Sequence, residues 1–338
     1  MEILNPDTAN DKLAALRPAF RFYRPLADAV DQLVAEAQDD QRLFTGIEEI
    51  DRLTRGIGRG HLAEIIGYSH SGKTLVVLHI LRKNNKARWL YFAPDETRTL
   101  VLAKLAAIHL SIPAEDLEAK IRDGDAETIG LVRRVATEEY PNLVLVDAPL
   151  DMDTINGTYD EVVENVWDGQ PPHGVILDFM DLFRHGDGDG AMLQKFNAIK
   201  GWGIQRYVPV IVVHQTSRTS GKSGQEISID SGSHGGETHA TFLIGVWRER
   251  SAILAELKEL RAKRNRQPAD NNRIAELDQD LAQADFELCV NLAKNKRPGG
   301  RTHEDPIYME IEHGTGALVQ LFDGARSTQW QQMTMEQS

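Results

Sequence analysis

Residues 62–81 of the chain read LAEIIGYSHSGKTLVVLHIL, and this stretch decides the predicted fold. A mostly apolar run leads into a turn of glycine, serine and histidine, and a second apolar run follows the turn. The first run predicts a buried strand and the second predicts a helix. A lysine and two glycines between two core segments serve no packing purpose, so we interpret the turn as a ligand-binding loop.

The turn matches the phosphate-binding pattern G-x-x-x-x-G-K-[ST] at Gly67, Gly72, Lys73 and Thr74. The glycines let the backbone curl so that successive N–H groups point at phosphate oxygens, and the following helix adds its positive dipole end. Lys73 is expected to contact the β and γ phosphates, and the Thr74 hydroxyl is expected to bind Mg²⁺. The sequence therefore predicts a site for ATP and Mg²⁺. The predicted nucleotide-binding residues are Gly67, Tyr68, Ser69, His70, Ser71, Gly72, Lys73, Thr74 and Leu75.

Composition excludes several classes of protein. The chain has 338 residues, of which 41% are hydrophobic and 26% are charged, as in ordinary soluble proteins. No apolar run predicts a transmembrane helix, and the N-terminus does not resemble a signal peptide. The single cysteine, Cys289, fits a reducing cytosol, so we expect a cytoplasmic protein with no membrane partner. The net charge of −13 argues against a surface that coats nucleic acid, but a narrow basic channel is compatible with it.

Strand and helix patterns alternate along most of the chain and predict an α/β fold, with a mainly parallel β-sheet flanked by helices. Residues 1–42 are expected to form a short N-terminal helical extension, which either packs on its own domain or docks on a neighbouring subunit. Residues 251–284 predict an inserted helical hairpin broken at residues 267–270, which is either a solvated structural arm or an interaction arm. A flexible polar tail is expected at 326–338, so the ATPase domain would span 43–325.

Polar residues at the ends of other predicted strands supply the remaining parts of a hydrolytic site. Asp178 ends the segment GVILD and is expected to hold the magnesium ion through water. Asp95 and Glu96 follow another strand, and either could orient the attacking water while the other caps the next helix. Gln215 ends a further strand, where its amide could sense the γ-phosphate.

Two segments are candidates for contacts beyond the nucleotide. A long loop after Gln215 is rich in glycine and serine, which suits either an ordered contact with single-stranded nucleic acid or a plain flexible loop. Its candidate DNA-binding residues are Arg218, Lys222, Ser233, His234 and Gly235. The segment LAKNKRPGGRT holds cations that form either a solvated rim or a trans-acting set for the γ-phosphate of an adjoining subunit. These cations are Lys294, Lys296, Arg297 and Arg301.

In this order, the motifs resemble those of the RecA superfamily, most closely the C-terminal ATPase domain of DnaB-type replicative helicases, particularly phage versions. The segments FTGIEEIDRL, VILDFMDLF, VVHQTSR and LAKNKRPGG are similar to that family's successive motifs around the phosphate loop. The resemblance covers roughly residues 44–322, apart from the inserted hairpin. It implies a RecA-like fold and a hexameric ring, with ATP between subunits, that translocates on single-stranded DNA during replication. By resemblance, the family's roles fall on Lys73 and Thr74 (Walker A), Asp178 (Walker B), Gln215 (sensor), and Lys294 and Lys296 (trans cations).

The sequence also departs from the helicase pattern. Asp95 stands where the family has a glutamate base, and Lys296 stands where helicases have arginine, although Arg297 follows it. A Lys-Asn-Lys segment of this kind occurs in the recombinase branch, and residues 1–42 are too few for the helicase N-terminal domain. The leading hypothesis is an ATP-dependent DNA helicase or translocase with replication proteins as partners, in the bacterial host cytoplasm if phage-encoded. The alternatives are a RecA-like recombination or repair ATPase that forms filaments, and a regulatory or loader ATPase.

Overall fold

The computed structural model describes residues 42–185, 191–216, 226–228, 239–322 and 325–329, with a few single residues near either end. Contacts divide the chain into two units, Met1–Gln41 and Arg42–Ser338. In the first unit, a short 3-10 turn, η2, spans Leu26–Asp28, and the described residues after it are helical and exposed. No helix in the described ranges is both long and apolar enough to cross a membrane.

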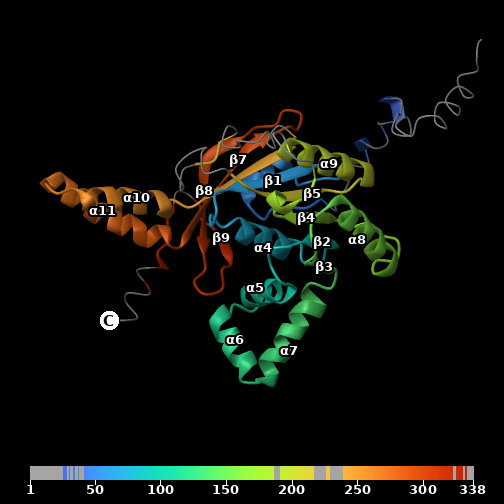
Figure 1. Cartoon of the computed structure of the whole chain (residues 1–338), viewed down its shortest axis with the longest axis horizontal. Coiled ribbons are helices and arrows are strands. Elements are labelled where there is room, and N and C mark those ends of the chain that lie inside the picture. Colours follow the sequence, from blue (N-terminus) through green and yellow to red (C-terminus); the bar gives the residue numbers. More distant parts are fainter. Residues whose placement is uncertain are drawn as a thin grey trace, which may run out of the picture. The chain divides into compact units, whose positions relative to one another are not determined.

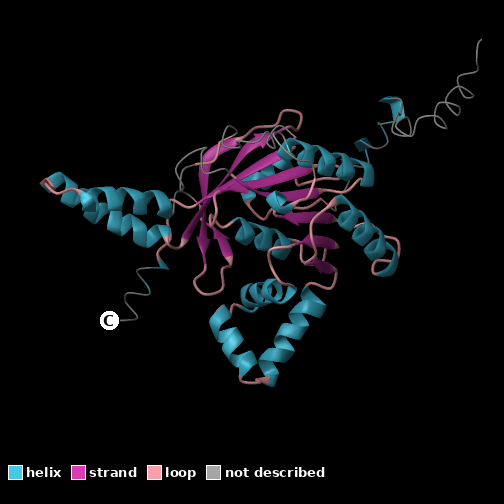
Figure 2. Ribbon diagram, viewed as in Figure 1, coloured by secondary structure: helices cyan, strands magenta, loops and turns pink. Residues whose placement is uncertain are grey.

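The second unit is built on one sheet, whose nine described strands lie in the order β3-β2-β4-β5-β1-β6-β7-β8-β9 (Figures 1 and 2). The strands are β1 (Leu62–Gly67), β2 (Trp89–Phe92), β3 (Leu143–Val146), β4 (Gly174–Asp178), β5 (Val210–Gln215), β6 (Phe242–Trp247), β7 (Glu287–Asn295), β8 (His303–Ile311) and β9 (Leu318–Gln320). The strands from β3 to β6 pair in parallel, and β7, β8 and β9 continue the sheet in antiparallel pairs. The prediction of a mainly parallel sheet is therefore confirmed.

Helices cover both faces of the sheet, as the uninterrupted apolar runs of the central strands require. One face packs against α4 (Lys73–Lys83) and α5 (Arg98–Leu110), with Ile65, Tyr91 and Val213 in the shared core. The other face packs against α8 (Met152–Asn165) and α9 (Ala191–Arg206). The remaining helical elements of this part are α3 (Glu48–Thr54), α6 (Ala114–Arg122), α7 (Ala126–Arg134), the π-helix η3 (Val135–Glu139) and the 3-10 turn η4 (Met180–Leu182).

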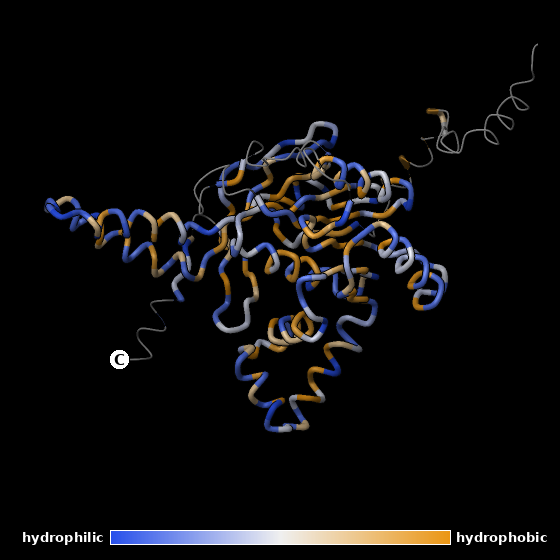
Figure 3. Tube along the Cα trace, viewed as in Figure 1, coloured by the Kyte–Doolittle hydropathy of each residue, from blue (hydrophilic) through white to orange (hydrophobic). Residues whose placement is uncertain are grey.

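The hairpin predicted between two strands is present as α10 (Arg250–Ala262) and α11 (Pro268–Ala284). Figure 1 shows the two helices side by side and extending away from the sheet, and Figure 3 shows that the arm is largely hydrophilic. Leu257 and Leu277 are buried between the helices, and Arg261 pairs with Asp278 at 2.6 Å.

The predicted break in this hairpin lies too late in the sequence. The turn falls at residues 263–267, and Pro268 is the first residue of α11. Proline is tolerated there because the first helical N–H has no partner within the helix. A capping box between Gln267 and Asp270 completes this helix start, so the proline begins the second helix and does not interrupt it.

The C-terminal segment differs from the predicted polar tail at its beginning. The closing hairpin of β8 and β9 is present as predicted, but residues 325–329 then return to the sheet. Arg326 donates hydrogen bonds to both carboxylate oxygens of Glu287, a buried residue of β7. Ser327 is itself buried, and its N–H donates to the same carboxylate at 2.6 Å. A tail that starts at residue 326 is therefore wrong, because the buried Glu287 takes its partners from this segment.

Replacing Arg326 with alanine is expected to lower the free energy of unfolding by about 2 kcal/mol, because hydrogen bonds to a charged partner are lost. Glu287, which is only 3% exposed, would keep its charge without the guanidinium. Urea unfolding followed by circular dichroism measures the change. Arg264→Ala is the matched control, since Arg264 is exposed and makes no ion pair among the described residues. Equal stability of the two variants would contradict the structural role of Arg326.

Candidate functional site

A cleft of about 410 Å³ lies at the edge of the sheet where β1, β2, β4 and β5 end. The carboxyl ends of neighbouring parallel strands meet at one edge, so residues that are distant in sequence come together there. The cleft contains the phosphate loop from Ser69 to Leu75, together with Asp95, Glu96, Asp178, Phe179, Gln215 and Arg248. The structure thus brings together most of the catalytic residues that the sequence predicts.

The phosphate loop is fixed by a close approach of backbones. A Cβ atom added at Gly67 would lie 2.2 Å from the carbonyl oxygen of Val246 in β6, so only glycine fits. Gly72 has a φ of 97° and is the N-cap of α4, where a side chain would be strained. The strand, turn and helix therefore lie in the order that the sequence predicts, with the positive end of α4 at the cleft.

Lys73 folds back over the loop. Its Nζ donates to the carbonyl oxygens of Gly67 at 2.9 Å and Tyr68 at 2.7 Å. Burial lowers the pKa of Lys73 to about 8, and the carboxylates of Asp178 and Asp181 oppose this change. A buried ammonium group whose partners are mainly carbonyl dipoles would gain electrostatic energy from a bound anion.

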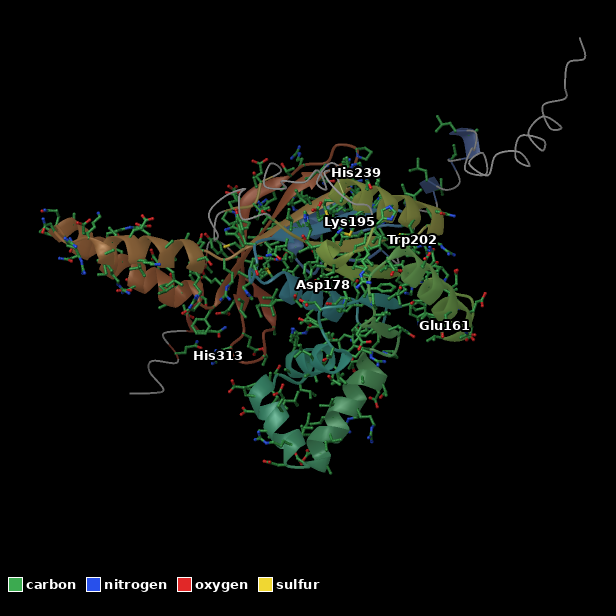
Figure 4. The ribbon with its side chains drawn as sticks, in the orientation of Figure 1. Glu161, Asp178, Lys195, Trp202, His239 and His313 are labelled. Carbon is green, nitrogen blue, oxygen red and sulfur yellow. The ribbon has the colours of Figure 1, made fainter. Side chains whose placement is uncertain are left out.

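Asp178 ends β4 and is largely buried in the centre of the molecule (Figure 4). Burial raises the pKa of Asp178 to about 6, while the hydroxyl of Tyr91, 2.8 Å from its Oδ2, lowers it. The peptide bond from Asp178 to Phe179 is cis.

The cleft offers oxygen ligands that suit Mg²⁺. The Asp178 carboxylate and the Thr74 hydroxyl both line it. The described residues contain no group of three or more His, Cys, Asp or Glu side chains able to hold a metal by themselves. Mg²⁺ commonly binds through one or two protein oxygens, waters and substrate phosphates, so this donor set fits a nucleotide-bound magnesium ion.

The two acids after β2 have different surroundings. Glu96 forms an ion pair with Lys104 at 2.5 Å, whereas Asp95 is exposed in the cleft and makes no ion pair within the described ranges. Thr97 is the N-cap of α5, and its side chain accepts a hydrogen bond from the Leu100 N–H. The alternative in which one of the acids caps this helix is therefore wrong.

Gln215 enters the cleft from β5, and its backbone N–H donates to Asp181 at 3.1 Å. Its side-chain amide makes no hydrogen bond to any described residue and remains available to a ligand. The preceding residue, His214, is fully buried on the other face of the sheet. It pairs there with the equally buried Glu64 of β1 at 2.8 Å, a contact that sequence analysis did not predict.

The predicted trans cations lie at the opposite edge of the sheet. Since β7 is antiparallel to β6, Asn295 pairs with Phe242 at the beginning of β6, whereas Cys289 pairs with Trp247 near the cleft. Lys294 and the residues that follow Asn295 therefore lie where β1 and β6 begin. They do not reach the cleft of their own chain, in contrast to the other predicted catalytic residues.

Sequence analysis missed Arg248, which follows β6 directly and lines the cleft. Its Nη2 donates to the carbonyl oxygen of Asp285 at 2.6 Å, and its buried Nε has no hydrogen-bond partner among the described residues. Burial lowers the pKa of Arg248. A cation immediately after the strand that neighbours β1 was the available signal. The candidate DNA-binding residues Arg218, Lys222, Ser233, His234 and Gly235 lie outside the residues that the structure describes.

Comparison with solved structures identifies the fold. The chain is similar to a DnaB-like replicative helicase, solved to show its interactions with primase, with a TM-score of 0.63 and 17% identity over 88% of this chain and 67% of the helicase. It is equally similar to the solved ATPase domain of a phage DnaB-like helicase, with a TM-score of 0.63 and 17% identity over 88% of this chain and 99% of that domain. No family profile and no curated protein sequence matches the chain. The chain therefore has the RecA-like fold of DnaB-like helicase ATPase domains, as predicted.

Replacing Gly67 with alanine is expected to abolish ATP binding, because the added Cβ would displace the phosphate loop from the β6 backbone. Fluorescence titration with a labelled ATP analogue measures the affinity. Gly58→Ala is the control, since its Cβ would meet nothing closer than 3.5 Å. Tight binding by Gly67→Ala would show that the close approach is not needed for the loop.

Proposed function

We propose that the chain is an ATP-hydrolysing DNA helicase or translocase of the DnaB-like type. It would act as an oligomeric ring on single-stranded DNA during replication in the cytoplasm, that of the bacterial host if phage-encoded. The observation that carries this proposal is the split of the catalytic set between the two edges of one sheet. Lys73, Asp178 and Gln215 share the cleft, whereas Lys294 and its neighbours lie at the far edge.

Each cleft residue has a role that its surroundings support. Lys73 would leave the loop carbonyls and bind the β and γ phosphates, with the loop N–H groups around them. Thr74 and Asp178 would hold Mg²⁺, which supplies neutralisation of phosphate charge when bound. Gln215 would contact the γ-phosphate through its available amide, while Asp181 fixes its backbone.

We assign orientation of the attacking water to Asp95. The Glu96 carboxylate is already engaged by the Lys104 ammonium group, whereas Asp95 faces the cleft without a cation and can accept a hydrogen bond from water. Asp95 also stands where the helicase family has its glutamate base. The Glu96–Lys104 pair would then hold the segment between β2 and α5 in position.

A second hollow next to the cleft is suited to the nucleotide base. Leu75 and Arg248 line both spaces, and Phe286 and Ile311 add apolar surface to the second. A planar base could lie between the Arg248 guanidinium and these side chains, which would fix the orientation of the triphosphate. This would give Arg248, which has a buried Nε without a partner among the described residues, a direct contact with the ligand.

The far-edge cations favour a head-to-tail assembly. If they are to touch the γ-phosphate, the far edge of one subunit must face the cleft of the next. Such a heterologous contact gives a ring when the rotation closes and a filament when it does not. A closed ring is the arrangement of the proposed motor, and the Lys-Asn-Lys segment keeps the filament-forming recombinase as the second candidate.

The proposal is tested by ATP hydrolysis with and without single-stranded DNA. We expect Mg²⁺-dependent hydrolysis that DNA stimulates, six-fold rings in electron micrographs with ATP, and strand displacement on forked DNA. Lys73→Ala should abolish hydrolysis, because the phosphates lose their cationic partner. Helical filaments without strand displacement would favour the recombinase. Hydrolysis that does not respond to DNA would contradict the motor.

Asp95→Asn is expected to reduce the turnover rate by about 100-fold or more, the usual contribution of a general base, and to leave ATP affinity unchanged. Glu96→Gln is the matched control and should lose much less activity, because Glu96 faces Lys104. Steady-state hydrolysis at saturating ATP compares the two variants. A larger loss in Glu96→Gln would exchange their roles.

A further inference from the structure

Tyr91 is a buried residue of β2 that no predicted role includes. Its side chain is fully buried, and its hydroxyl donates to Oδ2 of Asp178 at 2.8 Å. Asp178 makes no other side-chain hydrogen bond among the described residues, and its Oδ1 has no protein partner there. The phenol is therefore the one protein group, in the described part of the chain, that fixes the direction of this carboxylate.

Strand register explains why the two side chains meet. Tyr91 pairs with Ile176 in the parallel ladder of β2 and β4, and Asp178 lies two residues further along the same strand. Residues two apart share one face of a sheet, so both side chains point to the face covered by α4 and α5. The phenol ring lies within the apolar core of that face, and only its hydroxyl reaches the cleft edge.

We infer that Tyr91 is a positioning residue for the magnesium site: it holds Oδ2 of Asp178 and thereby directs Oδ1 at the water or metal ion bound in the cleft. This inference rests on the proposed function of the cleft. A carboxylate that binds a metal is held in direction by a second hydrogen bond, and the loss of such a partner usually weakens the metal site. A phenol suits this place because its ring packs in the core, while its hydroxyl supplies a donor to a buried charge.

The test measures nucleotide affinity with and without magnesium. A fluorescent ADP analogue is titrated into wild-type protein and Tyr91→Phe, once with excess Mg²⁺ and once with EDTA. The ratio of the two affinities is the gain that magnesium provides, and it does not depend on turnover. We expect Tyr91→Phe to reduce this ratio by about tenfold, the lower end of the effect of losing a metal ligand's partner. Its affinity in EDTA should stay at the wild-type value, which also reports that the site has folded.

Tyr140→Phe is the matched control. Tyr140 is 4% exposed, and its buried hydroxyl has no hydrogen-bond partner among the described residues, so this change also removes a buried hydroxyl. Its magnesium ratio should equal that of the wild type. A wild-type ratio in Tyr91→Phe, or an equal loss of affinity with Mg²⁺ and with EDTA, would overturn the positioning role. A wild-type protein that gains nothing from magnesium would contradict the proposed nucleotide site itself, and this inference with it.

Discussion

Parallel pairing of β1, β4 and β5 brings three chemically different groups to one edge of the sheet. Gly67 pairs with Gln215, and Asp178 pairs with Val213, so the phosphate loop, the carboxylate and the amide end at the same level. A slip of one residue in either ladder would turn Asp178 or Gln215 to the opposite face. The apolar residues between these positions are buried on both faces and oppose such a slip. Core packing and site geometry are therefore one constraint.

Buried polar groups next to the site follow the same strands. On the face covered by α4 and α5, Tyr91 hydrogen bonds to Asp178, and on the other face Glu64 hydrogen bonds to His214. A buried ionisable group is costly unless it is paired, so each contact restricts how its two strands can move relative to each other. The Glu64–His214 pair joins β1 to β5 directly below the loop and Gln215. Movement of either strand end would have to carry this pair with it.

Much of this site could be predicted from the sequence, because its parts are local patterns. The phosphate loop, Asp178 and Gln215 are each the end of an apolar run, and strand ends gather at one edge. The contacts of Tyr91, Glu64 and the segment after residue 325 could not be predicted, since each depends on register between distant strands. Helices α8 and α9 have weak apolar periodicity and were not predicted either. In each of these cases, tertiary packing decided what local pattern left open.

Charge gives a physical reason for the site to be completed from outside the chain. Among the described residues that line the cleft, Lys73 and Arg248 face three carboxylates, those of Asp95, Glu96 and Asp178. A triphosphate would add further negative charge in a partly buried space, where its repulsion is screened less than in water. The chain carries a net charge of −13, so its general surface would not compensate. A divalent cation and the far-edge cations of a second subunit would supply the missing positive charge. Binding of the nucleotide and contact between subunits would then stabilise each other, because each lowers the electrostatic cost of the other.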